Sequence, residues 1–311
     1  MPGESDLLGA IEAGGTKFIC AVGRRQGHDG CSTLEELRIP TTDPTTTLQA
    51  ATAFFLSQRR ARGPIRALGL ATFGPIELDR SAANYGSMLA TPKPGWSHVP
   101  LLASFARELG CPMGLDTDVN AAAMAELKWG AGRDLNSLAY ITVGTGIGVG
   151  IIVNGQCVHG LLHPEGGHIV PRRHPDDRGY KGNCPFHGDC LEGLASGPAI
   201  AARAGMPASE LGANHASWAF VADYLGQLCA QLVLIQSPER IIIGGGVMTQ
   251  AGLIDQVRDR MLHWLGGYIQ RPQLGNGAAA YVVSPGLGER SGLMGAFALA
   301  ESAASSHTGI G

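Results

Sequence analysis

An α/β fold with an internally repeated architecture is predicted for this chain from three features. Residues 7–23 form an apolar strand, a glycine turn and a second strand, and residues 138–155 repeat this pattern about 130 residues later. Stretches with helical apolar spacing lie between the two hairpins. A third apolar strand, within 238–248, also runs into a glycine cluster. Glycine hairpins are common in unrelated proteins, so the hairpins alone do not prove a duplication.

The other elements follow from periodicity and from glycine and proline positions. Apolar runs predict strands within two further segments, 67–76 and 111–120. Helical spacing predicts five helices, at 46–61, 101–110, 120–130, 216–236 and 291–302. Loops are expected where glycine, proline and histidine gather, at 83–100 and 159–192. A division before the third of these helices gives a small lobe at 1–119 and a larger lobe at 120–311.

Composition excludes several classes of protein. The 311 residues are 44% hydrophobic and carry a net charge of −3, which argues against disorder and against nucleic acid or an anionic membrane as the main partner. The N-terminus lacks the basic and apolar pattern of a signal peptide, and the apolar stretch 138–153 is too short and glycine-broken to span a membrane. Seven scattered cysteines favour a reducing compartment, so we expect a cytoplasmic protein.

Glycine makes up 46 residues, about twice the usual share. Three clusters follow apolar strands, at 14–15, 144–148 and 244–246. The first continues into Thr16 and Lys17, so that unhindered N–H groups, a hydroxyl and an ammonium group stand together, as a polyphosphate requires. None of the clusters has the spacing of a Walker A loop or a dinucleotide fingerprint. Any one of them could be an ordinary turn, whereas three together favour nucleotide binding.

Cysteine and histidine gather between residues 168 and 190. Cys184, His187 and Cys190 are each three residues apart, and His168 precedes them. Two thiolates and two imidazoles suit a closed tetrahedral zinc site, which is structural rather than catalytic. The alternative is a pair of ordinary thiols beside solvent-exposed histidines. The remaining histidines of the loop 159–192, at 159, 163 and 174, are interpreted as surface residues without a partner.

Asp118 stands between an expected strand and an expected helix. A carboxylate there can remove a proton from a hydroxyl that attacks a phosphate, and it can equally cap the helix. Asp116 lies two residues earlier and would share its face of an extended strand. Residue chemistry alone leaves both roles for Asp118 open.

Three segments in order carry a family resemblance: residues 11–17 (IEAGGTK), 116–120 (DTDVN) and 142–148 (TVGTGIG). Together they resemble the sugar kinases of the ROK family (repressors, open reading frames, kinases), within the actin-like ATPase superfamily. Residues 83–87 (ANYGS) and 91–96 (TPKPGW) resemble the bacterial fructokinase branch of that family. The resemblance runs from about Leu8 to the final helix.

The resemblance implies two lobes of ribonuclease H-like sheet, an active-site cleft between them, and a last helix (about 291–303) that packs back on the first lobe. It also implies ATP- and Mg²⁺-dependent phosphorylation of fructose on its 6-hydroxyl, a structural Zn²⁺ and a homodimer. Glu12 departs from the Asp that the superfamily usually carries, although the fructokinase branch often has Glu there, and Glu12 could reach Mg²⁺ directly or through water.

The resemblance also assigns roles to individual residues. Asp118 is implied as the catalytic base. ATP is implied to contact Gly14, Gly15, Thr16, Lys17, Thr142, Gly144, Thr145, Pro198, Gly245, Gly246, Val247 and Met248. The sugar is implied to contact Asn84, Gly86, Asn120, Glu165 and His168. Zinc is implied to bind His168, Cys184, His187 and Cys190. Lys93 stands where glucose-preferring relatives commonly have Asn.

Two other functions stay open within the family. One is a broader hexose kinase acting on mannose or glucose, and the other is a sugar-binding protein without catalysis. The repressors of the family carry an N-terminal helix-turn-helix, and only eleven residues precede Glu12 here, so we expect no DNA-binding module.

Overall fold

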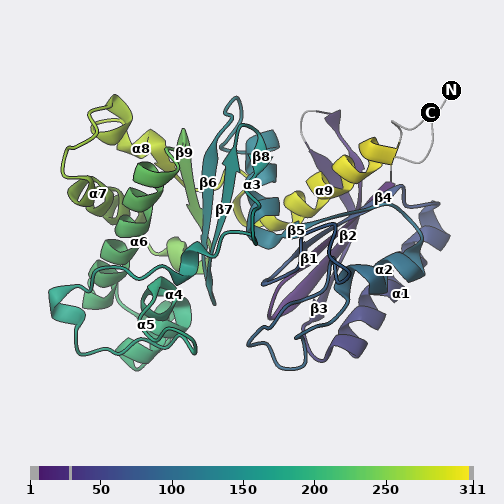
Figure 1. Ribbon diagram of the computed structural model, residues 1–311, viewed down its shortest axis with the longest axis horizontal. Coiled ribbons are helices and arrows are strands. Elements are labelled where there is room, and N and C mark those ends of the chain that lie inside the picture. The colour runs from purple at the N-terminus through teal and green to yellow at the C-terminus, as the bar shows by residue number, and fades with distance from the viewer. Residues whose placement is uncertain (1–6, 28–29, 308–311) are drawn as a thin grey trace. The chain divides into compact units, whose positions relative to one another are not determined.

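The computed structural model describes residues 7–27 and 30–307 (Figure 1). Contacts divide these residues into two compact units. The first comprises the described residues of Met1–Arg133, Cys157–His163 and Glu289–Gly311, and the second comprises Asp134–Gln156 and Pro164–Gly288. Each unit contains a mixed β-sheet, so the predicted α/β class is confirmed.

The sheet of the first unit has the strand order β3-β2-β1-β4-β5. β1 and β2 form an antiparallel hairpin in which Ala13 faces Phe18, and β3 extends it, whereas β4 and β5 add parallel strands on the other side of β1. The strands are β1 (Leu7–Ala13), β2 (Lys17–Arg25), β3 (Cys31–Pro40), β4 (Ala67–Thr72) and β5 (Met113–Thr117).

The sheet of the second unit repeats this arrangement. Its order is β10-β9-β6-β7-β8, with an antiparallel β6–β7 hairpin and parallel β9 and β10 on the other side of β6. The strands are β6 (Leu138–Val143), β7 (Ile147–Val153), β8 (Gln156–Cys157), β9 (Arg240–Gly244) and β10 (Val282–Val283). The same five positions recur in the same order, so the predicted internal repeat is present in the described residues.

Helices cover both faces of the first sheet. Leu68 and Leu70 of β4 point into an apolar core with Phe55 of α1 and Phe105 of α2. Gly69, between them, points to the opposite face, where α9 packs on β1, β4 and β5 and also contacts α3 (Figure 1). These helices are α1 (Pro44–Arg62), α2 (Leu101–Leu109), α3 (Asp118–Trp129) and α9 (Ser291–His307).

The contact between α9 and the sheet depends on two glycines, which have no side chain. A Cβ atom on Gly69 would lie 1.8 Å from the carbonyl oxygen of Ala296, and one on Gly114 would lie 2.3 Å from that of Leu299. Such distances cannot be accommodated against backbone atoms, so only glycine allows the helix to approach these strands so closely. The last helix of the chain is therefore part of the first unit's interior.

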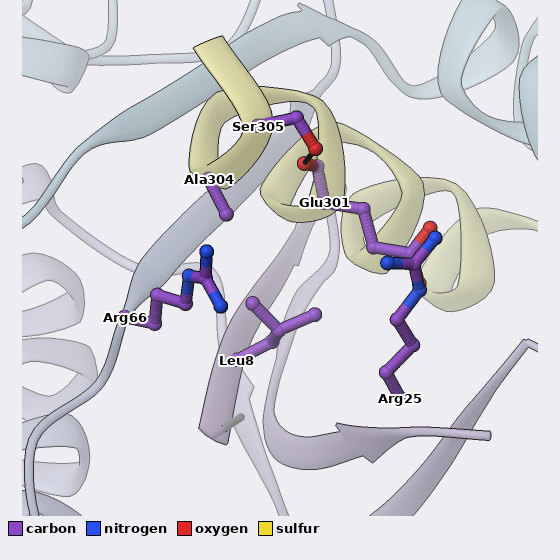
Figure 2. Close-up of a pocket in the computed structure, with 6 residues that line it drawn as sticks. All are labelled: Leu8, Arg25, Arg66, Glu301, Ala304 and Ser305. Carbon is purple, nitrogen blue, oxygen red and sulfur yellow. Dashed lines mark hydrogen bonds and ion pairs between the residues drawn. The ribbon is translucent and has the colours of Figure 1, made fainter. Parts of the chain in front are cut away.

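A buried carboxylate fixes the far end of α9. Glu301 is 6% exposed, and it pairs with Arg25 Nε at 3.2 Å and with Lys128 Nζ at 2.9 Å. Figure 2 shows Arg25 reaching the Glu301 carboxylate. A small cavity of about 50 Å³ lies beside them, between β1 and α9. Two cations compensate the charge of Glu301, so its burial is tolerated and ties α9 to β2 and α3.

The core of the second unit surrounds one long helix. α6 is long and apolar enough to cross a membrane, but 72% of its most apolar window is buried, which is typical of a core helix. It packs against α7 and α4, with Leu225 and Leu228 in the apolar core. The helices of this unit are α4 (Leu191–Ala195), α5 (Gly197–Ala204), α6 (Ala216–Ile235), α7 (Leu253–Leu265) and α8 (Ala278–Tyr281).

Candidate active-site residues

The first glycine cluster forms the turn of the β1–β2 hairpin. Gly14 N–H donates to the carbonyl of Lys17 at 2.9 Å, and Thr41 holds the turn from the side through its hydroxyl, which donates to the carbonyl of Gly14 at 2.7 Å. Thr16 and Lys17 are exposed at the tip. The hydroxyl and ammonium group that the sequence singles out therefore point away from the core.

Glu12, at the end of β1, carries an unusual carboxylate. Its Oε2 atom is buried and has no hydrogen-bond partner among the described residues. Burial, followed by the negative charge of Asp118, raises the pKa of Glu12 to about 7. A Cβ on Gly292, at the start of α9, would lie 2.5 Å from Glu12 Oε1, so a glycine there leaves room for the carboxylate. This arrangement favours a cation or a proton at Glu12.

Asp118 is the first residue of α3, and the helix does not depend on it as a cap. Thr117 is the N-cap, because its hydroxyl accepts from Asn120 N–H at 3.2 Å. Asp118 Oδ1 accepts from Val119 N–H at 2.9 Å, and the residue is half-buried. The structural interpretation of Asp118 as the helix cap is therefore wrong, since a threonine fills that role.

Asp116 is buried, and its carboxylate is hydrogen-bonded to neighbouring protein groups. Its side chain is 5% exposed, and its carboxylate accepts from Asn120 Nδ2 at 2.8 Å and from Thr117 N–H at 2.8 Å. His159 Nε2 lies 3.0 Å from the other carboxylate oxygen. A carboxylate only accepts hydrogen bonds, so Asp116 fixes which end of the Asn120 amide is nitrogen. Oδ1 of Asn120 then has no partner among the described residues.

Two predicted sugar contacts of the first unit lie in the loop after β4. Asn84 is exposed, and its carbonyl accepts from Ser87 N–H at 2.9 Å. Gly86 has φ +75°, and a Cβ there would lie 2.4 Å from Leu102 Cβ, so the fold itself requires this glycine. Lys93, also in this region, donates from Nζ to the carbonyl of Thr41 at 3.0 Å, next to the glycine turn.

The second unit brings its three predicted nucleotide segments together. The β6–β7 turn carries Gly144, whose carbonyl accepts from Gly197 N–H at 2.8 Å, at the start of α5 where Pro198 is exposed. A Cβ on Gly245 would lie 2.4 Å from the carbonyl of Val143, so the turn after β9 abuts the same hairpin. Residues about 50 and 100 positions apart in the sequence therefore meet. The other predicted ATP contacts, Thr142, Thr145, Gly246, Val247 and Met248, lie on or next to these turns.

Glu165 is the N-cap and His168 the last residue of a single turn of 3₁₀ helix, η2 (Gly166–His168). A Cβ on Gly167 would lie 1.8 Å from the carbonyl of Ile147, so this turn sits directly on β7. Desolvation, followed by the charge of Glu192, raises the pKa of Glu165 to about 7. The two predicted sugar contacts of this unit are thus held at one place by backbone packing.

His168, Cys184, His187 and Cys190 form a compact cluster. Their ligand atoms all lie within 4.8 Å of one another. His168 Nδ1 lies 3.8 Å from Cys184 Sγ and 3.5 Å from Cys190 Sγ, while His187 Nδ1 lies 3.7 Å from Cys184 Sγ. These separations match the edges of about 3.6 Å that tetrahedral coordination produces. The sequence prediction that these four residues meet is confirmed, and they could hold a metal ion.

Backbone hydrogen bonds and a helix start hold the two cysteines of this cluster in place. Cys184 and Gly188 exchange two backbone hydrogen bonds of 3.1 and 2.9 Å, and Cys190 is the N-cap residue of α4. All seven cysteines, each among the described residues, are free thiols, so the pair is available as ligands. His168 presents Nδ1 to the thiols and so keeps Nε2 on the other edge of its ring for a different partner.

Three histidines differ from the expectation that they lie on the surface without partners. His159 bonds Asp116 as described above. His163 is 6% exposed, and its Nε2 accepts from Ile76 N–H at 3.3 Å. His174 is half-buried and accepts at Nδ1 from Asp176 N–H at 3.2 Å. The expectation was wrong because His159 and His163 contact residues distant in the sequence and the ring of His174 lies 5.0 Å from that of Phe220, which residue spacing does not report.

Comparison with known proteins agrees with these features. The ROK family model matches residues 8–303. A fructokinase of Zymomonas mobilis subsp. mobilis is 41% identical over 303 residues, covering 96% of this chain and 98% of that protein. A fructokinase of Pediococcus pentosaceus is 38% identical over 297 residues, with the same coverage of 96% and 98%.

A solved structure is similar over the same span. It is a ROK family glucokinase from Streptomyces griseus in complex with glucose and AMPPNP, with a TM-score of 0.72 and 25% identity, covering 95% of this chain and 99% of that one. The matches extend over both sheets, the glycine turns and the His–Cys cluster. This chain belongs to the ROK family of sugar kinases and related proteins.

Proposed function

We propose that this protein transfers the terminal phosphate of ATP to the 6-hydroxyl of D-fructose and releases fructose 6-phosphate and ADP. Two relatives named fructokinase, at 41% and 38% identity over nearly the full chain, support the substrate. The observation that carries the chemistry is Asp118, a half-buried carboxylate at the start of α3 whose charge acts on Glu12.

Asp118 is proposed as the general base. The proton of the sugar hydroxyl moves to its carboxylate while the hydroxyl oxygen forms a bond to the γ-phosphorus, and the bond between that phosphorus and the bridging oxygen of ADP breaks. Thr117 already caps α3, so Asp118 is not required for the helix to start. Because Asp118 is not needed as a helix cap, its carboxylate is consistent with a role in catalysis.

The glycine turns are proposed to hold ATP. A Cβ on Gly15, Gly144 or Gly246 would meet no atom within 4 Å among the described residues, and none of the three has positive φ. Neither packing nor backbone strain therefore explains the absence of a side chain, whereas close approach of a phosphate does. Gly14 to Lys17 would contact the phosphates, as would Thr142, Gly144 and Thr145, and adenine would lie near Pro198 and residues 245–248.

Glu12 is proposed to hold Mg²⁺, directly or through water. Its buried oxygen without a partner and its raised pKa fit a site that is completed by a cation. Carboxylate oxygens are the protein ligands that Mg²⁺ prefers. When bound with ATP, the ion neutralises charge on the phosphates.

The His–Cys cluster is proposed to bind structural Zn²⁺ because two thiolates and two imidazoles leave no open position. Through Nδ1, the ion would fix the ring of His168 and leave Nε2 to a sugar hydroxyl. Glu165, Asn84 and Asn120 are proposed as further sugar contacts. Gly86 serves the fold, as its φ and its contact with Leu102 indicate.

The proposal is tested by measuring ADP release with fructose, mannose and glucose in turn. We expect turnover with fructose to exceed turnover with glucose by a large factor. A preference for glucose or mannose would instead favour a broader hexose kinase. No sugar-dependent ADP with any of the three would refute the kinase function and leave a binding protein.

His159 is proposed to position Asn120 through Asp116. Removing the imidazole frees one side of the Asp116 carboxylate and loosens the amide that it orients. We expect His159→Gln to raise the KM for fructose about tenfold and to leave the KM for ATP unchanged. His263→Gln, an exposed histidine on α7, is the control.

The pH profile separates positioning from a merely structural role. The hydrogen bond to Asp116 raises the pKa of His159. The protonated pair is complete below about pH 6.5 and weakens as the pH rises through the raised pKa. The KM for fructose should therefore depend on pH over that window in both proteins, because Glu165 also titrates there, and the rise with pH should be smaller in His159→Gln. Identical profiles in the two proteins would argue against this role.

A further inference from the structure

A cavity of about 360 Å³ that is lined by several arginines and a tryptophan lies in the second unit, apart from the residues assigned to the kinase reaction. One wall is the segment 172–178, with Arg172, Arg173 and Arg178. The other wall is α7, with Arg260 and Trp264. Figure 1 shows α7 beside α6, which supplies the floor at Asp223. Four guanidinium groups thus line one cavity.

Asp223, the one carboxylate that lines this cavity among the described residues, is already neutralised. It is 2% exposed, and its Oδ1 accepts from Arg260 Nε at 2.7 Å and from Trp264 Nε1 at 2.9 Å. Its Oδ2 accepts from Gln227 Nε2 at 3.0 Å. Asp223 and Arg260 therefore compensate each other and form a rigid floor, and the charge of the other arginines decides the sign of the cavity.

The other three arginines differ in how they are paired. Arg173 bonds Asp189 at 3.0 Å, and its buried Nε has no partner among the described residues. Arg172 and Arg178 are exposed, and within the described part of the chain neither has a carboxylate at ion-pair distance. The guanidinium carbon of Arg172 lies 5.9 Å from the centre of the Trp264 ring. The cavity therefore keeps two uncompensated positive charges, one of them beside an aromatic face.

The arginine-bearing segment is held in place by buried polar side chains. Gln227 clamps the backbone of Arg172, accepting from its N–H at 2.7 Å and donating to its carbonyl at 2.9 Å. Tyr224 OH accepts from His174 N–H at 3.3 Å and donates to Asp177 at 2.8 Å. Asp177 is in turn paired with the buried Arg203 at 2.8 Å. The segment is thus preorganised, which reduces the entropy lost on binding a ligand.

We propose that this cavity binds a small phosphorylated sugar. The planar guanidinium group of arginine matches the oxygens of a phosphate monoester. Arg172 and Arg178, which have no ion-pair partner among the residues that the structure describes and lie on a fixed segment, supply the positive charge. The indole face of Trp264 suits the C–H face of a sugar ring. The volume lies within the range of small-molecule sites. This site is separate from the proposed kinase reaction and does not depend on it.

Binding is measured by calorimetry and tryptophan fluorescence, with glucose 6-phosphate, glucose and inorganic phosphate added to the full-length protein at low salt. We expect glucose 6-phosphate to bind with a Kd of about 1 mM or tighter, and glucose not to bind at this site. The double variant Arg172→Ala/Arg178→Ala should weaken glucose 6-phosphate at least tenfold. Trp264→Phe should abolish the fluorescence change.

A matched control removes the same charge elsewhere. Arg60 and Arg107 are exposed on helices of the first unit, so Arg60→Ala/Arg107→Ala should leave the Kd within twofold. Equal weakening by the two double variants would overturn the site, as would inorganic phosphate binding as tightly as glucose 6-phosphate, or no binding up to about 10 mM. Asp118→Asn should retain the binding, so that failure of the kinase proposal and failure of this one are distinguishable.

Discussion

Asp118→Asn should leave the protein folded and lower kcat with fructose by about a thousandfold or more, because asparagine cannot take the proton of the attacking hydroxyl. The helix start should survive, since Thr117 is the N-cap and the asparagine oxygen can still accept from Val119 N–H. The measurement is sugar-dependent ADP release, together with the thermal midpoint, which should stay within about 2 °C of the wild type.

Asp43→Asn is the matched control for this variant. Asp43 also stands at a helix start, where its Oδ1 accepts from Thr46 N–H at 2.9 Å and caps α1. Asparagine caps helices about as well as aspartate, so this variant should keep both its stability and its activity. Turnover near the wild-type value in Asp118→Asn would remove Asp118 from the mechanism.

Cys190→Ser should have the second large effect, on metal content and on the stability of residues 164–193. Cys190 is fully buried, and its Sγ lies 3.5 Å from His168 Nδ1. A serine hydroxyl is a poor zinc ligand, so bound zinc should fall from about one per chain to less than half, with a thermal midpoint lower by about 5 °C or more. Limited proteolysis should then cut within this segment first.

Cys111→Ser, a half-buried cysteine of the first unit, should keep a full complement of zinc. The variants are compared by metal analysis of the purified proteins and by the KM for fructose, which should rise only in Cys190→Ser because His168 loses its fixed orientation. A folded, active wild-type protein with less than about one-tenth of a zinc per chain would contradict the structural metal site.

The parts of the site that could be predicted are those with local sequence signatures. Cys184, His187 and Cys190 lie three residues apart in a short loop, so their meeting is nearly forced by the chain, and His168 is only sixteen residues upstream. The hairpin at Gly14 and the one at Gly144 are equally local. By contrast, the approach of Pro198 and Gly245 to the second hairpin followed from family resemblance, because no spacing rule links them.

The contacts that escaped prediction are long-range ones. His159 and Asp116 are 43 residues apart and pair because residues 157–163 belong to the first unit, although the chain has already entered the second. The predicted division between residues 119 and 120 also differs from the division into units that the contacts give, in which the first unit continues to Arg133. A Cβ on Gly295 of α9 would lie 2.3 Å from the backbone carbon of Ala121, so α3 packs with the C-terminal helix inside the first unit.

The high glycine content also serves the packing of α9 against the first sheet. Beyond the turns proposed to bind phosphate and the loop proposed to bind zinc, Gly69 and Gly114 are required where α9 meets the sheet. Such positions have no local signature, because a strand glycine that faces a helix looks like any other until the helix is in place. Part of the high glycine content therefore reflects close packing of backbones. The positions of these glycines in the sequence do not reveal that role.

The place of α9 in the first unit has a consequence for synthesis. β1 is among the first segments to leave the ribosome, and the helix that covers its sheet is among the last described segments to be translated. A nascent chain can complete the second unit while one face of the first sheet is still bare. That face stays uncovered until translation has passed Ser291, so a premature stop before it should yield an aggregating fragment rather than a shorter enzyme.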